Sequence, residues 1–197
     1  MTPFEDRLET LVRNVEAADH ASGWDQSPAR LLRVIDGPLG LTYDAMPLHK
    51  LDESPRRAVE MIADMYEHQG GEAVRRSQAK LGLADAVAHI FITEMYMRNN
   101  DTDEGAWGSA GWTEEKMIEE LERRYGTSRF VDIPGSIEGR MAVGVYGDEQ
   151  SMWVVRRRHE QPQFWPLWPP DIDLQARGAV TDALHRIQAA HAATASS

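Results

Sequence analysis

Apolar residues recur at helical spacing near the start of the chain and predict a first helix. Thr2, Pro3 and Glu5 begin this pattern with a hydroxyl at the N-cap, a proline at the first helical position and a glutamate at the third. These residues satisfy or pre-organise the free amides of a starting helix, and Gly23 marks its end. The apolar stripe consists of Phe4, Leu8, Leu11, Val12 and Val15.

The same periodicity and clear end signals predict further helices. A second helix is expected over 54–70, where a Ser-Pro pair opens the pattern and glycine closes it. A short helix is expected over 72–81, and another over 113–126 has acidic residues in its first turn and arginines in its last. A final helix follows Asp171 or Asp173. Its stripe consists of Val180, Leu184, Ile187 and His191.

Alternating and β-branched segments predict strands. Arg140–Gly147 and Ser151–Arg158 flank a short polar turn and predict a hairpin. Leu31–Ile35 and Leu41–Met46 predict a second pair of strands, joined by a turn that contains glycine and proline. The stretch Ala84–Met97 fits a helix by spacing and a strand by residue type, and we favour the strand.

This order of elements predicts the fold class and the domain organisation. We expect one α+β domain over residues 1–193, with an antiparallel sheet of about 4–5 strands covered by helices and with helical N- and C-termini. Residues 194–197 are expected to form a flexible tail. Hydrophobic residues make up 42% of the chain and charged residues 27%, which is typical of a folded globular protein.

Charge and residue usage disfavour several classes of function. The net charge of −11 repels nucleic acid and anionic lipid, so neither is expected as a partner. The chain has no cysteine, so disulfides, thiolate zinc sites and cysteine nucleophiles are excluded. The N-terminal residues are acidic where a signal peptide is basic, and no apolar run reaches the ~18 residues of a membrane span. The protein is therefore expected to be cytoplasmic.

Two separated segments carry a resemblance to known proteins. Gly23-Trp24-Asp25-Gln26-Ser27-Pro28-Ala29-Arg30-Leu31 and Arg140-Met141-Ala142-Val143-Gly144-Val145 resemble an uncharacterised group of actinobacterial proteins, which have proline where this chain has Ser27. The resemblance implies a shared architecture and an actinobacterial or actinophage origin. The order of elements is also similar to that of secretion-chaperone-like folds, which are small, acidic and often dimeric, but a shared topology does not imply a shared function.

Trp24 allows two interpretations. Gly23 can end the first helix while Trp24 packs back over it and Asp25 accepts hydrogen bonds from turn amides, which is a purely structural role. Alternatively, the indole of Trp24 is the centre of a recognition site.

The segment Phe164-Trp165-Pro166-Leu167-Trp168-Pro169-Pro170 is the most distinctive stretch of the chain. Its prolines remove amide donors, so it cannot lie in a helix interior or in the middle of a sheet. Either Trp165 and Trp168 fill a groove between the predicted hairpin and the last helix, or Phe164 and the two indoles form part of a protein interface.

Motifs for chemistry are weak. Asn99-x-Asp101-x-Asp103 imitates the start of a calcium loop, but the loop's sixth position holds glutamate where glycine is required. Asp85, His89 and Glu94 are the best candidates for a carboxylate and histidine site in an enzyme. No metal and no cofactor is expected.

These patterns favour a non-enzymatic cytosolic protein–protein interaction factor of adaptor, chaperone-like or regulatory type. Its expected partner is another protein, and a homodimer is also considered. The expected binding residues are Phe164, Trp165, Trp168 and Trp24. The alternatives are an enzyme that uses Asp85, His89 and Glu94, and a structural component of a larger assembly such as a phage particle.

Overall fold

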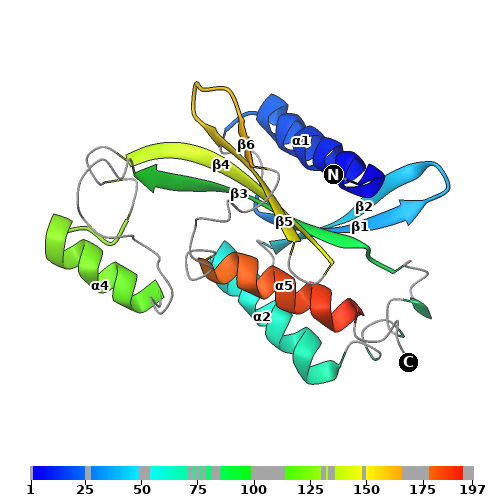
Figure 1. Ribbon diagram of the computed structural model, residues 1–197. Coiled ribbons are helices and arrows are strands. Elements are labelled where there is room, and N and C mark those ends of the chain that lie inside the picture. Colours follow the sequence, from blue (N-terminus) through cyan, green and yellow to red (C-terminus); the bar gives the residue numbers. More distant parts are fainter. Residues whose placement is uncertain are drawn as a thin grey trace.

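An antiparallel sheet organises the protein, as the computed structural model shows (Figure 1). The structure describes residues 2–24, 28–48, 54–70, 73, 76, 79–80, 85–98, 114–129, 132, 136–147, 150–165 and 178–192. Within these residues the strand order is β2-β1-β3-β4-β5-β6, and every neighbouring pair is antiparallel. The strands are β1 (Arg30–Gly37), β2 (Gly40–Pro47), β3 (Ala88–Arg98), β4 (Ser136–Tyr146), β5 (Gln150–Arg157) and β6 (Gln163–Trp165).

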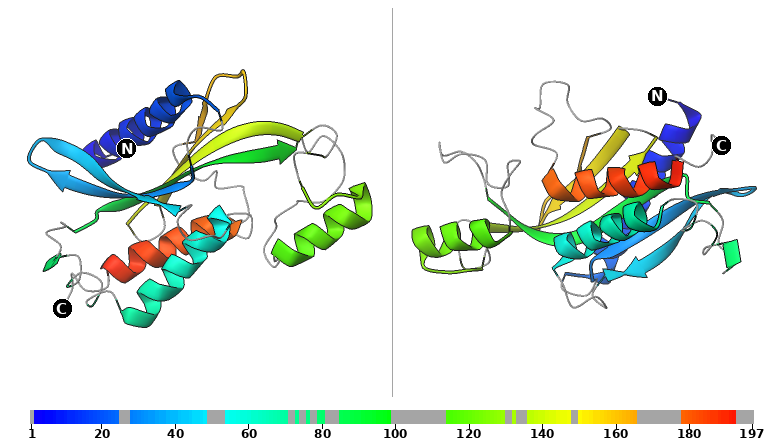
Figure 2. Two further views of the ribbon diagram at one scale, coloured as in Figure 1. Left: turned by 180° about the vertical axis from the view of Figure 1, so that it is seen from behind. Right: turned by 90° about the horizontal axis from the view of Figure 1, so that it is seen from below.

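Helices cover both faces of the sheet (Figure 2). Helix α1 lies on one face, and α2 and α5 lie side by side on the other. The far ends of β3 and β4 extend beyond these helices toward α4 (Figures 1 and 2). The predicted α+β class with helical ends is confirmed, and a three-residue β6 extends the five longer strands. The described helices are α1 (Pro3–Ser22), α2 (Pro55–Gln69), α4 (Glu114–Tyr125) and α5 (Gly178–Ala192).

The start of α1 has the predicted cap. The Thr2 hydroxyl accepts a hydrogen bond from the Glu5 backbone N–H at 3.3 Å, and the Glu5 carboxylate accepts one from the Thr2 N–H at 2.6 Å. This capping box satisfies two amides that the helix itself leaves free. Gly23 follows the helix with φ of 98°, a conformation that favours glycine.

Each face of the sheet has its own apolar core. Because successive side chains of a strand point to opposite faces, Ile90 and Ile92 of β3 face α1, whereas Phe91 faces α2 and α5. The α1 core also contains Leu8, Val12, Val15, Leu32, Val34, Ala88, Ala142, Tyr146, Met152 and Val154. The opposite core also contains Leu31, Leu48, Ala58, Val59, Ile62, Ala63, Tyr66, Val143, Val145, Ala183, Leu184 and Ile187.

The ambiguous stretch 84–97 forms a strand from Ala88 onward. Helices cover both faces of the first half of β3, so Ile90, Phe91 and Ile92 are all buried and this part lacks the alternation of a half-exposed strand. Both predicted hairpins are confirmed with the expected partners. The helix predicted over 72–81 and the flexible tail 194–197 fall mostly or wholly outside the described residues.

Candidate functional site

The C-terminal end of α1 meets β3, β4 and β5 at a cluster of charged side chains around Trp24. Glu94 of β3, Arg140 of β4 and Arg156 of β5 are neighbours across the sheet, because Arg140 is the register partner of both other residues. All three therefore project toward the α1 face. We call this cluster the arginine–tryptophan corner. It comprises Glu16, Asp19, Trp24, Arg30, Glu94, Glu138, Arg140, Arg156 and Arg158.

Arg140 is the centre of the corner and is fully buried. Its Nη2 donates to the Gly23 carbonyl oxygen at 2.9 Å and to Glu94 Oε1 at 2.5 Å. Its guanidinium carbon lies 4.8 Å from the centre of the Trp24 ring, within the range of a cation–π interaction. Arg140 thus fixes both the turn that follows α1 and the indole that this turn carries.

A second arginine contacts the same indole. The guanidinium carbon of Arg158 lies 5.6 Å from the Trp24 ring centre, and Arg158 also forms an ion pair with Glu138. The His20 ring meets the indole nearly edge-on, with ring centres 6.2 Å apart. Trp24 nevertheless stays half-buried, so part of the side chain faces solvent.

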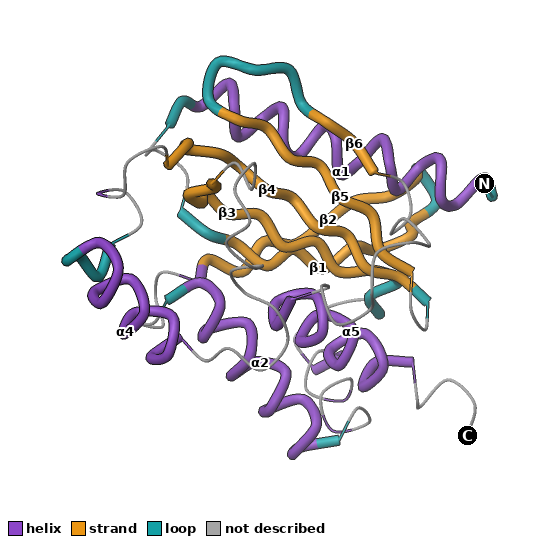
Figure 3. The backbone as a smooth tube through the Cα atoms, turned by 60° about the vertical axis from the view of Figure 1, so that its left-hand side comes forward, coloured by secondary structure: helices purple, strands orange, loops and turns teal. Residues whose placement is uncertain are grey.

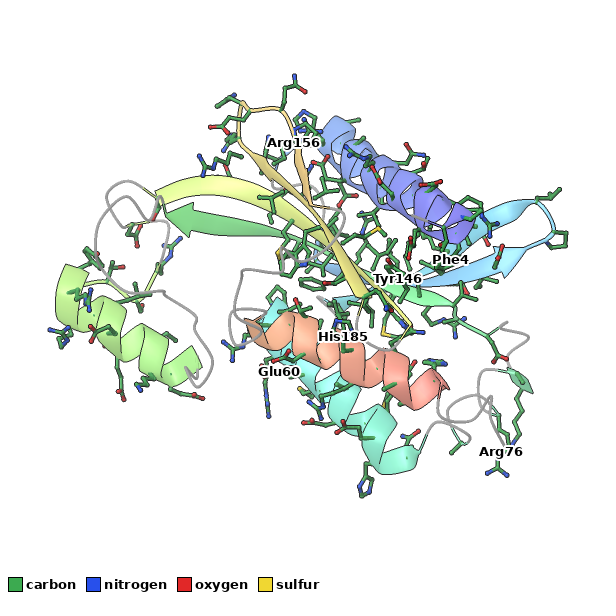
Figure 4. The ribbon with its side chains drawn as sticks, viewed as in Figure 1. Phe4, Glu60, Arg76, Tyr146, Arg156 and His185 are labelled. Carbon is green, nitrogen blue, oxygen red and sulfur yellow. The ribbon has the colours of Figure 1, made fainter. Side chains whose placement is uncertain are left out.

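Two further ion pairs tie α1 to the sheet. Arg156 donates from Nε and Nη2 to the two carboxylate oxygens of Glu16 at 2.6 and 2.8 Å. Both side chains are buried, and the hydrogen bond to Glu16 raises the pKa of Arg156. Asp19 on the next turn pairs with Arg30 at the start of β1. Figure 4 shows Arg156 beside the C-terminal end of α1.

The predicted binding residues divide into three groups. Trp24 lies in the corner, as described. Phe164 and Trp165 belong to β6, where their backbones pair with Val154 and Trp153 of β5, and Trp168 lies outside the described residues. Because β6 is the edge strand, its position agrees with the exclusion of this segment from the middle of the sheet. The loop between β5 and β6 lies beside the end of α1 (Figures 1 and 3).

The three residues proposed for an enzyme do not assemble. Glu94 pairs with Arg140 on the α1 face, whereas His89 points to the opposite face and contacts α5. Asp85 is exposed and precedes β3. Residues five positions apart on a strand face opposite sides, so Glu94 and His89 cannot line one cleft.

His89 instead belongs to a buried cluster on the α2 and α5 face. Its Nδ1 lies 2.8 Å from Gln188 Oε1, and its ring centre lies 5.1 Å from that of His191. The Tyr66 ring lies 5.1 Å from the His191 ring on its other side. Burial lowers the pKa of His89 to about 3, His191 and Arg33 act in the same direction, and the hydrogen bond with Gln188 opposes them. His89 is therefore neutral at physiological pH.

An apolar pocket of about 240 Å³ lies at the start of α2 and α5, and Glu94 of the arginine–tryptophan corner is among the residues that line it. Phe91, Thr93 and Met141 form its floor on the sheet, and Ser54 and Val180 contribute from the helix starts. Its lining is mainly apolar, with Arg56 and Glu94 as the charged residues, and we assign it no catalytic role.

Metal chemistry has no support in the part of the chain that is described. Within those residues, no group of three or more histidine, aspartate or glutamate side chains could hold a metal ion. The calcium-like stretch from Asn99 falls outside the described residues. None of the described helices is both long and apolar enough to cross a bilayer.

No protein-family model, curated protein or solved structure matches this chain. The function is therefore inferred from the geometry of the corner itself.

Sequence reasoning missed Glu16 and Arg156 as a pair. Arg156 lies in the basic run Arg156-Arg157-Arg158-His159, and by sequence alone such a run is typical of a charged strand end. In the structure, strand alternation sends Arg156 inward to Glu16 and leaves Arg157 half-exposed. The sequence feature that could have indicated this pair is Glu16 itself, because this glutamate lies on the apolar side of α1, one turn after Val12.

Proposed function

We propose that the protein is a non-enzymatic cytosolic protein–protein interaction factor whose partner binds at the arginine–tryptophan corner. The observation that carries this proposal is the half-buried indole of Trp24, held 4.8 Å from the guanidinium of Arg140 and 5.6 Å from that of Arg158. Tryptophan and arginine are the side chains that most often dominate the binding energy of protein interfaces.

The corner is organised before any partner arrives. Arg140 holds the Gly23 carbonyl and the Trp24 ring at once, and its own position is fixed by Glu94. An interface built on side chains that are already ordered loses less conformational entropy on binding. This pre-organisation supports recognition rather than a purely structural role for Trp24.

The neighbouring edge of the sheet extends the proposed surface. Strand β6 carries Phe164 and Trp165 and has no strand on its outer side among the described residues. A partner that contacts Trp24 and Arg158 would lie close to this edge, because Arg158 belongs to the loop that leads to β6. We include Phe164, Trp165 and Trp168 in the proposed surface on the sequence argument given above.

The test is recovery of a partner from a lysate of the source cells with tagged full-length protein. Wild type and Leu39→Ala should recover the same stoichiometric protein, because Leu39 is fully exposed at the far hairpin and serves as a matched control. Trp24→Ala should lose it, and Arg158→Ala should weaken it. With the purified partner, Trp24→Ala should raise Kd by roughly 30-fold or more, as for an interface hot spot.

Folding of the variants must be established by circular dichroism and thermal unfolding. Arg158→Ala is the safer variant, because the Arg158 side chain is 42% exposed and its removal leaves Arg140 in place. Equal recovery by wild type and both corner variants would refute the corner as the interface. Recovery of no partner by wild type would refute the interaction function itself.

A further inference from the structure

Among the described residues, no strand pairs with the outer edge of β2. Strand β2 is last in the sheet order, and residues 42–46 are exposed on both faces of the strand. Tyr43 is 43% exposed and Met46 is 37% exposed, both high values for large apolar side chains. This edge is the opposite edge of the sheet from β6.

The direction of the free hydrogen-bonding groups follows from the pairing of β2 with β1. The Leu48 N–H donates to the Ala29 carbonyl at 3.0 Å, in the same register as the pairs of the β1–β2 ladder. Hydrogen-bonded and non-hydrogen-bonded pairs alternate along an antiparallel ladder. Even-numbered residues of β2 therefore face β1, whereas Leu41, Tyr43 and Ala45 direct N–H and C=O groups outward.

This edge lacks the usual protection against pairing. Natural edge strands carry lysine, proline, bulges or inward-pointing charges that prevent another strand from adding. The register with β1 runs without a bulge, and Asp44, the one charged residue of β2, pairs with Arg33 at 3.0 Å. Proline occurs only at the last position, Pro47. Such an edge is a template on which another strand can add.

We propose that this strand is β2 of a second copy, paired antiparallel about a two-fold axis perpendicular to the sheet. In the register that we infer, Tyr43 lies opposite the partner subunit's Tyr43, and Leu41 lies opposite the partner subunit's Ala45. Each of these outward-facing pairs exchanges two backbone hydrogen bonds. The two sheets become one continuous sheet, and this inference is independent of the partner proposed for the corner.

The charge of Asp44 favours this register over the one whose two-fold axis passes through Asp44. A two-fold axis through Asp44 would place two carboxylates in a close, non-hydrogen-bonded pair, which is destabilising. With the axis at Tyr43, Asp44 lies opposite the partner subunit's Thr42, whose hydroxyl can donate to a carboxylate. The sequence of β2 is thus self-complementary.

Helix α2 supplies apolar area beside the same seam. Met61 and Met65 are 39% and 43% exposed. They lie on the side of α2 away from α5, because Asp64 and Glu67 on the other side bind Arg186 of α5. In the right-hand view of Figure 2, α2 lies between α5 and the β1–β2 hairpin.

Because the two-fold axis is perpendicular to the sheet, equivalent faces of the two copies lie on the same side of the joined sheet. The α2 helices of both copies therefore lie on one face, beside the junction of the two β2 strands. Their methionines can then meet across this junction. Stable interfaces bury roughly 1,200–2,000 Å² in total, more than two paired strands provide alone. The exposed Met61 and Met65 supply the additional apolar contact.

The expected mass by sedimentation equilibrium is twice 22.2 kDa at micromolar concentration. Each copy carries a net charge of −11, so added salt should strengthen the dimer by screening the repulsion.

Tyr43→Pro should give a folded monomer, because it removes an N–H that faces outward and leaves the β1 ladder intact. Tyr43→Val keeps that N–H and should remain a dimer. Met61→Glu/Met65→Glu should weaken association by roughly tenfold or more.

Cysteine crosslinking tests the register, and the chain has no native cysteine to interfere. Tyr43→Cys should form a disulfide-linked dimer under mild oxidation, because the two positions face each other at the axis. Leu39→Cys is the matched control: it is more exposed but lies at the hairpin tip, far from its counterpart in this register. Equal crosslinking of both variants would overturn the register.

Other outcomes identify other occupants and overturn the two-fold dimer. A wild-type protein that stays monomeric at ~100 µM, far above a micromolar Kd, refutes the proposal. Species that grow steadily with concentration would indicate head-to-tail pairing of β2 with β6 and an open assembly. A dimer that persists in Tyr43→Pro would place the interface elsewhere.

Discussion

The two faces of the sheet differ in the polar groups that they bury. On the α1 face, the buried Arg140 pairs with Glu94 and the buried Arg156 pairs with Glu16, so each of these arginines has a carboxylate partner. On the α2 and α5 face, Arg33 pairs with the exposed Asp44, whereas His89 is buried beside His191 and hydrogen-bonds Gln188. The first arrangement depends on both members of each pair, and the second depends on His89 remaining neutral.

Each arrangement follows from the side chains that the covering helix directs toward the sheet. Helix α1 turns Glu16 and Asp19 toward arginines of the sheet, so charge is neutralised locally. Helix α5 presents Gln188, an amide that hydrogen-bonds a neutral imidazole at no electrostatic cost. The two faces should therefore fail under different perturbations, one by loss of a partner and the other by acid.

The largest effect is expected from cutting one buried ion pair. Arg156→Met leaves the Glu16 carboxylate buried without its partner, which should lower the free energy of unfolding by about 3–5 kcal/mol. Urea denaturation at pH 7 measures this loss. The double variant Glu16→Leu/Arg156→Met removes both charges and should recover most of it. A double variant no more stable than the single one would contradict a buried, matched pair.

Acid should affect the opposite face. Above pH ~6.5 an unfolded-state histidine is neutral, so the contribution of His89 to stability is fully present there. As the pH falls, the unfolded chain binds a proton first, because the native pKa is about 3. Stability should decrease by roughly 1 kcal/mol per pH unit between these two values.

Urea midpoints at pH 7 and pH 4.5 test this slope. His89→Gln removes the titrating group while keeping a side chain that can hydrogen-bond, so its midpoint should fall less over the same range. Carboxylates titrate in both proteins and cancel in the difference. Identical pH profiles would show that His89 does not carry the acid sensitivity.

The smallest effect tests how closely α1 approaches the sheet. A Cβ added at Gly144 would lie 3.0 Å from Val12 Cγ2 and 3.2 Å from Met152 Cγ. Gly144→Ala should therefore cost about 1–3 kcal/mol by overpacking. At Gly37 the nearest atom would be 3.6 Å away, so Gly37→Ala is the control and should change the melting temperature little. Equal losses in both variants would refute close packing at Gly144.

Local patterns were sufficient to predict most of the described elements, although not the three-residue β6. The capping residues before α1, the turn between β4 and β5, and the residue types of β3 are all properties of a few neighbouring residues. The candidate site was harder to predict, because it depends on pairs that are distant in sequence. Arg140 contacts Gly23 and Glu94, and the spacing of none of these residues indicates the contact.

Strand alternation explains the remaining differences. The sequence alone did not decide whether Glu94 and His89 lie on one surface, because the angle between these two side chains differs between a helix and a strand. Because β3 is a strand, Glu94 points to one face of the sheet and His89 points to the other. Trp24 was predicted as a binding residue, but the arginines on either side of it come from β4 and from the loop after β5.

The order of strands also has a consequence for folding kinetics. The pairs β1–β2, β4–β5 and β5–β6 join neighbours in sequence and can form early, whereas β1 reaches β3 only across β2 and α2. Closing that long loop costs chain entropy before its contacts form. The slowest step of folding is therefore expected to be the pairing of β1 with β3. The packing of α2 against α5, which are also far apart in the sequence, is expected to form in the same step.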